Sequence, residues 1–415
     1  MGLDALYREV MEINVTDDKD KQKEAAKAFF DKLNFMDKPE YFNWAEEIFE
    51  GLHVKERGDK TALFWASLVD DQERSLTYSQ MATSANKLLN LLRKNGVAKG
   101  DNVYMMIPIV PETWIVSLAA VKGGLVAVPT ATSMTVRELN FRFEAYPPDV
   151  IIADEASLEP MNKALADTGC TPKVKLLVGS ADGWTSFADI EAESDQAEAA
   201  KTRSDDTLIC FFTSGTTGLP KLVGHSAMSY PLGHLSTAVM IGLKPDDVHH
   251  NLSAPGWAKW AWSSFFAPLN VGATATAFHF TALDGNKYVD FVTRYKVSTF
   301  CAPPTAWRMF IGLDLSKFDF SNLRASVSAG EPLNPEVIQQ WKKHTGTEIR
   351  DFYGQTESTA MIGNAPWMEG KMRAGSFGAP SFMYDMTLAD DEGNEIEYDA
   401  AGNPTTETLK TAEDR

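Results

Sequence analysis

A run of hydroxyl-bearing residues and glycines directly follows an apolar stretch in the middle of the chain. The apolar letters LICFF (208–212) lead into Thr213, Ser214, Gly215, Thr216, Thr217 and Gly218, and then into Leu219, Pro220 and Lys221. Glycines allow a tight turn that presents backbone N–H groups to an anion, the hydroxyls add donors, and Lys221 adds a positive charge. An ordinary surface turn is the alternative, but this combination after a strand favours a polyphosphate. Pro220 stands where a Walker A loop requires glycine, so the motif is of another type.

A second polar segment follows the short stretch EIR (348–350). It consists of Asp351, Phe352, Tyr353, Gly354, Gln355, Thr356 and Glu357. The aromatic pair could stack on a base or line a pocket, Gly354 leaves room for a ligand, and Thr356 could bind a phosphate or carboxylate oxygen. Glu357 is a hard oxygen ligand suited to Mg²⁺ held between protein and phosphates. Alone, the segment could equally be a polar turn after a strand.

Both segments lie in a chain whose apolar runs alternate between strand and helix patterns. Runs such as NVYMMIPI (102–109) and DVIIAD (149–154) read as buried strands, and PETWIVSLAAVKGG (111–124) reads as a helix opened by proline and ended by glycine. This alternation predicts an α/β fold with two stacked lobes of the αβαβα type, parallel-rich sheets and the start of a small β-barrel. We expect the polar residues 180–206 to link the lobes.

The boundaries we predict divide the chain into four parts. Residues 1–60 form a helical extension with a short helix ending near Gly51, and residues 61–200 form the first lobe. Residues 201–380 form the second lobe with the nucleotide and acid sites, and residues 381–415 form a β-hairpin and an acidic tail. That tail, from Asp385 to Arg415, holds ten acidic and two basic residues, or −8 of the total charge of −18.

Composition excludes several classes of protein. The chain has 415 residues, 44% of them hydrophobic and 23% charged, which are globular proportions. The net charge of −18 disfavours nucleic acid as the main partner. The longest apolar stretch, Trp114 to Val121, is too short to span a bilayer, and three scattered cysteines fit a reducing compartment. We therefore expect a cytoplasmic protein without a membrane span, with a homodimer as an open alternative to a monomer.

Taken together, the two polar segments resemble the signature of the adenylate-forming (AMP-binding) superfamily, and the chain resembles its medium-chain acyl-CoA synthetases over residues 40 to 395. SAGEPLNPE (328–336) resembles the family's adenine-contacting loop, which implies nucleotide contacts for Gly330, Glu331 and Pro332. SAPGWAKWAWSSFFAPL (253–269) resembles the acyl-pocket segment and implies acyl contacts for Gly256 and Trp257, with His250 as a further candidate. Acetyl-CoA synthetases carry tryptophan at the position of Gly354, so glycine there implies a pocket open to a longer acid.

The resemblance implies a two-step reaction with ATP, Mg²⁺, a small-molecule carboxylate and coenzyme A. The carboxylate attacks the α-phosphorus of ATP to give an acyl-adenylate and pyrophosphate, and the thiol of coenzyme A then displaces AMP. Because an anion must approach a polyanion, charge neutralisation is the main task. The implied catalytic residues are Lys221, Thr356 and Glu357, with Glu357 as the metal ligand.

Two features of the family are not found in this sequence. There is no TGD motif after residue 357 and no stretch resembling the small C-terminal lid domain that carries a catalytic lysine in the family. We therefore expect the large domain alone, which would bind nucleotide but turn over weakly or not at all. The alternatives are an adenylation module that loads a carrier protein and a non-catalytic nucleotide-binding relative.

Overall fold

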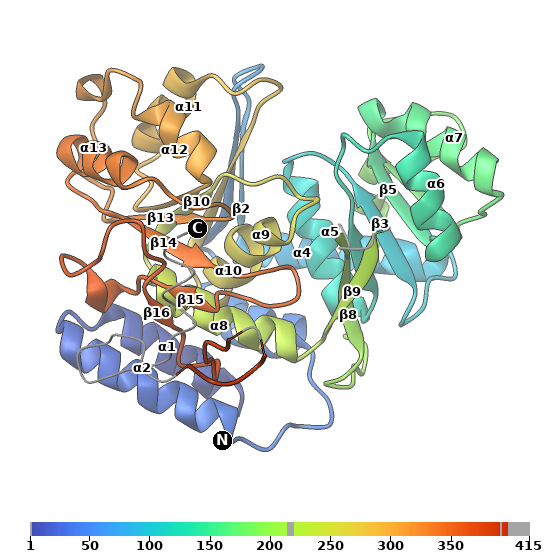
Figure 1. The fold of residues 1–415 in the computed structure, drawn as a ribbon. Helices are drawn as coiled ribbons and strands as arrows, with labels where there is room; N and C mark the ends of the chain where they lie inside the picture. The colour runs from blue at the N-terminus through green and yellow to red at the C-terminus, as the bar shows by residue number, and fades with distance from the viewer. Residues whose placement is uncertain (1, 214–219, 391, 397–415) are drawn as a thin grey trace.

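The computed structural model describes residues 2–213, 220–390 and 392–396, which form two α/β lobes lying side by side (Figure 1). In the described residues the larger lobe is built on a nine-stranded sheet and the smaller one on a seven-stranded sheet. We call them the nine-stranded lobe and the seven-stranded lobe. Most neighbouring strands in both sheets run parallel, which confirms the fold class expected from the alternating pattern.

The nine-stranded sheet is antiparallel only at its two edges. From one edge to the other it consists of β16 (Ala379–Pro380), β15 (Ile362–Gly363), β14 (Ile349–Tyr353), β13 (Ala325–Ala329), β12 (Thr299–Ala302), β10 (Val248–Asn251), β11 (Thr274–His279), β1 (Thr61–Ser67) and β2 (Glu73–Thr77). The antiparallel pairs are β16 with β15, β15 with β14, and β1 with β2.

The seven-stranded sheet has one antiparallel pair, β8 with β9. Its order is β7 (Thr185–Ser186), β6 (Val174–Val178), β5 (Val150–Asp154), β3 (Asn102–Met106), β4 (Val126–Pro129), β8 (Thr207–Thr213) and β9 (Lys221–Ser226). The hairpin of β8 and β9 therefore forms one edge of this sheet, and Thr213 pairs with Lys221 at the end where residues 214–220 connect the two strands.

The two sheets do not divide the chain at residue 200. Strands β1 and β2 precede the seven-stranded lobe in sequence but join the nine-stranded sheet, where β1 pairs with β11 in parallel. Strands β8 and β9 follow residue 200 but complete the seven-stranded sheet, where Ile209 pairs with Ala127 of β4. Each lobe is thus completed by a pair of strands from the other half of the sequence.

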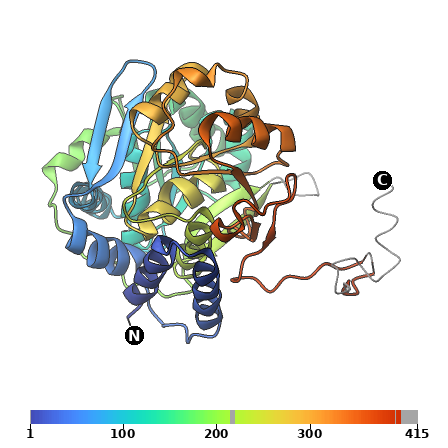
Figure 2. The ribbon, with the colours of Figure 1, turned by 90° about the vertical axis from the view of Figure 1, so that its left-hand side faces the viewer.

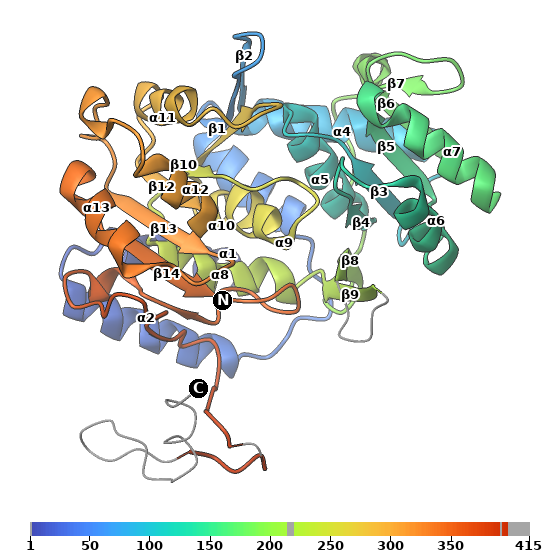
Figure 3. The same cartoon turned by 45° about the horizontal axis from the view of Figure 1, so that its top comes forward.

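Helices and sheets alternate in five layers (Figures 1 and 3). An outer layer of α11 (Gly285–Arg294), α12 (Pro304–Phe310) and α13 (Pro335–Thr345) covers the nine-stranded sheet and shares one apolar core with it. On the far side, α6 (Val136–Ala145) and α7 (Leu158–Thr168) cover the seven-stranded sheet around a second core. The largest core lies between the sheets, on the central helices α4 (Tyr78–Lys94), α5 (Pro111–Gly123) and α8 (Ser229–Ile241) together with the short segments α9 (Ala258–Trp260), η4 (Ala261–Phe266) and α10 (Ala267–Asn270).

Two N-terminal helices, α1 (Asp4–Val15) and α2 (Lys19–Asn34), lie beneath the nine-stranded lobe in Figure 1. The side-chain amide of Asn14 on α1 donates to the backbone oxygens of Ala238 (3.2 Å) and Leu243 (2.7 Å), so α1 caps the end of α8. A further helical stretch, η1 (Ala45–Val54) and α3 (Lys55–Arg57), runs through Gly51 rather than ending there. The helix continues because Leu52 and His53 are fully buried beyond the glycine.

The expected linker has more structure than its composition indicated. Residues 180–206 include β7 and η3 (Phe187–Ala192), and Phe187 and Ile190 are buried. The remaining 3-10 turns are η2 (Glu155–Ser157), η5 (Leu315–Lys317) and η6 (Pro366–Met368). A few apolar residues were enough to fix this polar stretch against the sheet edge.

The C-terminal end of the described chain extends away from the body of the molecule (Figure 2). Ile396 N–H donates to the Leu388 oxygen (2.8 Å) and Asp390 N–H donates to the Asn394 oxygen (2.9 Å), which makes the antiparallel turn expected around residues 392–394. The rest of the acidic tail, residues 397–415, lies outside the described residues. In the part of the chain that the structure describes, no helix is long and apolar enough to cross a membrane.

Candidate functional site

A cavity of about 590 Å³ opens where strands of both sheets end. Strands β13 and β14 are parallel neighbours, so their carboxyl ends lie at the same edge of the nine-stranded sheet, as is usual for ligand sites of open α/β sheets. Strand β8 of the other lobe contributes its last residue. The residues lining the cavity are Thr213, Trp257, Ala258, Lys259, Trp262, Ala329, Gly330, Gly354, Gln355, Thr356 and Glu357.

The cavity brings together residues from each of the motifs singled out in the sequence. Thr213 comes from the first polar run, Gly330 from the SAGEP loop, Trp257 from the tryptophan-rich segment, and Gln355 to Glu357 from the second polar segment. These four segments are far apart in the sequence. Their convergence in one cavity supports the interpretation that they form a single site.

Only the ends of the hydroxyl- and glycine-rich run lie within the described residues. Ser214, Gly215, Thr216, Thr217 and Gly218 are outside them, as is Leu219. Thr213 ends β8 and lines the cavity, and Lys221 begins β9 as an exposed residue paired with Thr213. The hairpin therefore places the lysine beside the strand that leads into the site.

The first three residues of the second polar segment do not line the cavity. Asp351 and Phe352 are buried at the end of β14, and Tyr353 packs its ring against Phe377 at a centroid distance of 5.8 Å. Burial raises the pKa of Asp351 to about 7, even though its carboxylate accepts a hydrogen bond from the Phe352 N–H (3.1 Å). These residues anchor the segment, and the next four reach the ligand space.

Gly354 is required by close packing rather than by open space. A Cβ atom at this position would lie 2.2 Å from the Thr359 backbone oxygen and 2.8 Å from Cη2 of Trp262. Gly354 and Trp262 both line the cavity. The expectation that this glycine leaves the pocket open to a longer acid stays a prediction.

The SAGEP loop contributes its glycine. Gly330 has a φ of 112°, a left-handed conformation that favours glycine, and it lines the cavity. Glu331 and Pro332 are exposed and do not line it. Glu331 instead faces Arg308 across an exposed ion pair of 3.5 Å.

Two of the expected acyl-site residues, His250 and Gly256, have roles in packing instead of lining the cavity. His250 is buried in β10, where its ring hydrogen-bonds with Thr276 and the Tyr288 hydroxyl and stacks on Phe278, and burial lowers its pKa to about 3. It does not line the cavity. Gly256 permits a close approach between the lobes, since a Cβ there would lie 2.5 Å from the backbone nitrogen of Ala131. Of the expected acyl-site residues, the cavity retains Trp257 and Gly354.

Trp257 lies at the mouth of the cavity. Its side chain is 64% exposed, in contrast to Trp260 and Trp262, which are buried. Trp257 thus forms an exposed part of the cavity wall.

Two residues of the site were missed from the sequence. Lys259 lines the cavity together with Trp257. Among the described residues that line the cavity, Lys259 is the one with a basic side chain. His225 lies in β9, and its Nε2 donates to the backbone oxygen of Thr356 (2.6 Å), while its ring stacks on Tyr230 at 4.1 Å. A lone lysine and a lone histidine carry no sequence signal of their own; only the position of Lys259 two residues after Trp257 could have indicated it.

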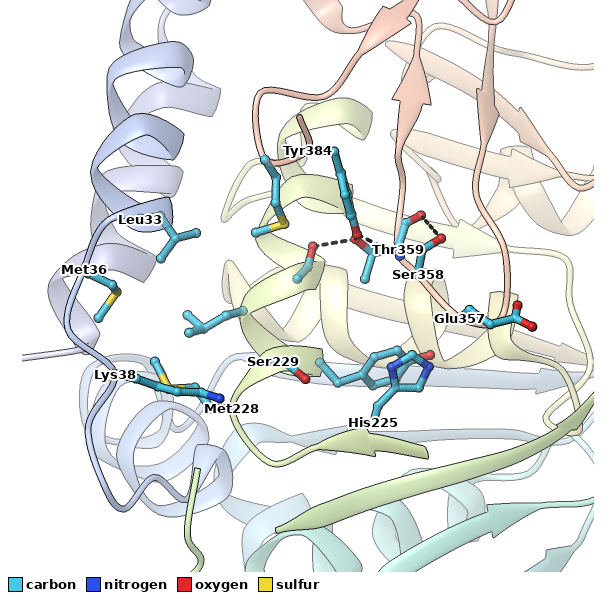
Figure 4. A pocket seen from close by; sticks show the side chains of 14 residues that line it. Leu33, Met36, Lys38, His225, Met228, Ser229, Glu357, Ser358, Thr359 and Tyr384 are labelled. Atoms are coloured by element: carbon cyan, nitrogen blue, oxygen red, sulfur yellow. Dashed lines mark hydrogen bonds between the residues drawn. The ribbon is translucent and has the colours of Figure 1, made fainter. Parts of the chain in front are cut away.

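The segment 357–359 separates the cavity from a second one of about 370 Å³ (Figure 4). The Thr359 N–H donates to the Tyr384 hydroxyl (3.0 Å), which in turn donates to Thr359 Oγ1 (2.7 Å). The second cavity is lined by Leu33, Met36, Lys38, His225, Met228, Ser229, Tyr230, Leu232, Gly233, Glu357, Ser358, Thr359, Met383 and Tyr384. Glu357 borders both cavities, so His225 and Tyr384 hold the wall between them.

The fold and the cavity define a class: α/β proteins with a ligand site at the carboxyl ends of parallel strands, built from two sheets. The profile of the AMP-binding enzyme family matches residues 52–403. The chain belongs to this family.

Two relatives are named as a CoA ligase and an acyl-CoA synthetase. The chain is 50% identical over 357 residues to "4-hydroxybutyrate--CoA ligase 1" of Metallosphaera sedula and 32% identical over 364 residues to "Acyl-coenzyme A synthetase ACSM3, mitochondrial" of Homo sapiens. Each alignment covers 86% of this chain and 62% of the relative. The chain therefore spans less than two thirds of the length of these curated relatives.

A solved structure shows the same fold. The anthranilate CoA ligase AuaEII, in complex with anthranoyl-AMP, matches 87% of this chain and 68% of its own chain with a TM-score of 0.80 and 30% identity. The likeness confirms the two-sheet architecture.

Proposed function

We propose that this chain binds ATP and a small carboxylic acid in the 590 Å³ cavity and forms an acyl-adenylate, which coenzyme A then converts to an acyl-CoA. The observation that carries the proposal is the convergence of Thr213, Gly330, Thr356, Glu357 and Trp257 on one cavity. Membership of the AMP-binding family and the names of the relatives support the same chemistry.

The lining of the cavity includes both polar and aromatic residues, which suits the two halves of an acyl-adenylate. Thr213, Thr356 and Glu357 supply hydroxyls and a carboxylate beside the entry to the hydroxyl- and glycine-rich run, which we assign to the phosphates. Trp257, Ala258 and Trp262 also line the cavity, and we assign them to the acid. We propose a short acid that is longer than acetate, as glycine at position 354 implies and in keeping with the name of the Metallosphaera relative.

Glu357 fits a role as a metal ligand. Within the described residues its exposed carboxylate forms no hydrogen bond or ion pair, and no group of three or more potential ligating side chains could hold a metal without help. One carboxylate that shares an ion with substrate phosphates is a common mode for Mg²⁺. A bound Mg²⁺ would neutralise phosphate charge there.

The chain's own residues position the reaction. The carboxylate oxygen bonds to the α-phosphorus while the bond to pyrophosphate breaks; the thiol of coenzyme A then bonds to the acyl carbon and AMP leaves. Lys221 and the backbone around Thr213 neutralise phosphate charge, and His225 holds the Thr356 backbone in place. No nucleophilic side chain is required.

Acid-dependent exchange of pyrophosphate into ATP tests the proposal. We expect exchange with acids of about four carbons. Lack of exchange with every acid from acetate to decanoate, together with lack of ATP binding by calorimetry, would contradict it. The sequence-based expectation of weak turnover by this 415-residue chain stays a prediction, and the same assay measures it. A cytoplasmic location and a homodimer also stay proposals, to be checked by fractionation and by light scattering.

A further inference from the structure

Thr356 and Glu357 form the tip of a tight turn in the cavity wall. The Ser358 N–H donates to the Gln355 oxygen (3.0 Å), and the Ser358 hydroxyl accepts the Gln355 N–H (3.0 Å), so residues 355–358 close on themselves. The Glu357 side chain is exposed, and in the described part of the chain its carboxylate has no hydrogen-bond or ion-pair partner. The position of this carboxylate therefore depends on the contacts that hold the turn.

Thr359, the residue directly after the turn, is anchored by two neighbours. It is 4% exposed, and its hydroxyl donates to the Gly233 oxygen of α8 (3.0 Å). The Tyr384 hydroxyl accepts the Thr359 N–H (3.0 Å) and lies 2.7 Å from Thr359 Oγ1 (Figure 4). Because the single proton of the threonine hydroxyl is donated to Gly233, the proton of the 2.7 Å bond comes from Tyr384. One tyrosine hydroxyl thus binds two atoms of Thr359.

The segment that carries Tyr384 is fixed to the body of the molecule by bonds of its own. The Ser381 N–H donates to the Met361 oxygen (2.7 Å), and Asn34 at the end of α2 donates to the Phe382 oxygen (3.3 Å). Tyr384 therefore links the turn to a segment that is itself attached at two places.

Tyr384 and His225 hold the two ends of the turn. His225 in β9 donates to the Thr356 oxygen (2.6 Å), and Tyr384 binds Thr359 from the C-terminal side. The ring of Tyr384 alone would suffice to pack against the second cavity. Its hydroxyl adds the partner of a buried N–H, and a buried N–H that loses its partner costs more than the bond itself contributed.

We propose that Tyr384 is a positioning residue for Glu357: its hydroxyl, acting through Thr359, holds the turn in the conformation in which the Glu357 carboxylate can meet a Mg²⁺ ion shared with the phosphates of ATP. The inference rests on the proposed function and deepens it. Tyr384 lines the second cavity and not the one assigned to ATP, so it acts on the ligand through the turn.

Binding of α,β-methylene-ATP tests this without turnover, because its methylene bridge resists cleavage. The compound is titrated by calorimetry into the full chain in excess Mg²⁺ and in EDTA. The readout is the magnesium gain, defined as the Kd in EDTA divided by the Kd in Mg²⁺. Tyr384→Phe keeps the ring and removes the hydroxyl. We expect its magnesium gain to be about 3- to 10-fold smaller than that of the wild type, the equivalent of one hydrogen bond, while its Kd in EDTA changes less.

Further variants separate positioning from a general loss of stability. Thr359→Ser keeps the hydroxyl and should keep the magnesium gain, whereas Thr359→Val removes the hydroxyl and should reduce the gain. Tyr104→Phe is the matched control, because the Tyr104 hydroxyl also donates to a backbone oxygen (Tyr146, 2.7 Å) but belongs to β3 and does not border the cavity. Its magnesium gain should equal that of the wild type. Thermal melting of each variant verifies that it is folded.

The outcomes separate the inference from the proposed function. If the wild type binds the analogue in neither condition, the proposed function fails and this inference with it. If the wild type binds the analogue without any magnesium gain, the metal role proposed for Glu357 fails, and the inference fails with that role.

A wild type with a clear magnesium gain tests the inference alone. It is overturned if Tyr384→Phe keeps the full gain, or if Tyr104→Phe loses as much. Should Tyr384→Phe not fold, the Thr359 pair decides: a full gain in Thr359→Val, or an equal loss in Thr359→Ser and Thr359→Val, overturns the inference.

Discussion

His225 links the Thr356 segment of the cavity wall to the edge of the seven-stranded sheet. Its Nε2 can only donate to the carbonyl of Thr356, so the ring carries its proton on Nε2, and stacking on Tyr230 fixes the ring plane. Burial lowers the pKa of His225, which keeps the ring neutral at pH 7. The histidine is thus a positioning residue for Thr356 and Glu357.

We predict that His225→Ala weakens the binding of butanoyl-sulfamoyl adenosine, a stable analogue of an acyl-adenylate, by about tenfold. A tenfold loss of affinity corresponds to the free energy of one good hydrogen bond. The measurement is calorimetry, with folding checked by circular dichroism. His279→Ala is the control, because His279 also stacks on an aromatic side chain (Trp65, 6.5 Å) but lies in β11 and does not border the cavity. Equal affinity of the His225 variant and the wild type would show that the Thr356 backbone needs no such support.

Asp351 should make the free energy of unfolding fall as pH rises. Its pKa in the folded protein is about 7, above the ordinary value of 3.8, so the folded state binds an extra proton between pH 4 and pH 7. Stability therefore falls as pH rises through this range, by up to about 4 kcal/mol from this group alone.

The Asp351→Asn variant removes that dependence. Relative to the wild type, its free energy of unfolding should increase as pH rises from 4 to 7 and level off above, measured by urea unfolding. Asp319→Asn is the control with the opposite sign, because a hydrogen bond from the Ser321 N–H (2.9 Å) lowers the pKa of Asp319. A difference between Asp351→Asn and the wild type that does not change with pH would contradict the assigned pKa.

At the scale of elements, α1 stabilises the helix that carries Tyr230. Asn14 is 1% exposed and donates to the Ala238 oxygen in the last turn of α8 (3.2 Å) and to the Leu243 oxygen just beyond the helix (2.7 Å). The Ala238 oxygen also accepts the Gly242 and Leu243 N–H groups, so among the described residues it is the Leu243 oxygen that depends on Asn14.

We predict that Asn14→Ala lowers the free energy of unfolding by about 1–3 kcal/mol, because the buried Leu243 oxygen loses its donor. The readout is the midpoint of thermal unfolding. Asn34→Ala on α2 is the matched control, since Asn34 is exposed and makes a single bond of 3.3 Å to the Phe382 oxygen. A shift no larger than that of the control would mean that the α1 cap contributes little.

The sequence predicted the helices and strands better than it predicted which strands pair with each other. Pro111 and Gly124 mark the two ends of α5, and the glycine adopts the left-handed conformation (φ 61°) that a helix end favours. No local pattern indicates that β1 belongs with β11 or β8 with β4, since those pairings join residues about 80 to 210 positions apart. Tertiary pairing therefore placed strands across the boundary expected at residue 200.

For the candidate site, too, local sequence signals could be read, whereas contacts between distant residues could not. Motif residues such as Gly330, Thr356 and Glu357 could be found because their types and spacing carry chemistry. The part played by Gly354 could not, because it depends on Trp262 and the Thr359 carbonyl, which lie close only in the folded chain. His250 was misplaced for a similar reason: its neighbours Thr276 and Tyr288 make it a core residue.

At the scale of the whole molecule, both lobes contribute to the cavity. Thr213 belongs to the seven-stranded lobe and the other lining residues to the nine-stranded lobe. The close approach of Gly256 to the Ala131 backbone, in the chain after β4, brings the lobes together beside the cavity. Of the total charge of −18, −8 lies in residues 385–415, so the body around the site is less acidic than the total indicates.

We predict that Gly256→Ala separates the lobes enough to weaken ligand binding. The added Cβ would lie 2.5 Å from a backbone nitrogen, which cannot move as a side chain can, so a loss of stability of about 1–3 kcal/mol is expected. Gly224→Ala is the control, since its Cβ would make ordinary contacts at 3.6 Å. Chemical unfolding and calorimetry measure both effects, and identical behaviour of the two variants would contradict the role of Gly256.

The most direct test of the central claim is a crystal structure of the chain with butanoyl-sulfamoyl adenosine. We predict electron density for the compound in the cavity lined by Gly330, Thr356 and Glu357, with the acyl group between Trp257 and Trp262. Density in the second cavity, between Leu33 and Tyr384, or an acyl group directed away from the tryptophans, would contradict it.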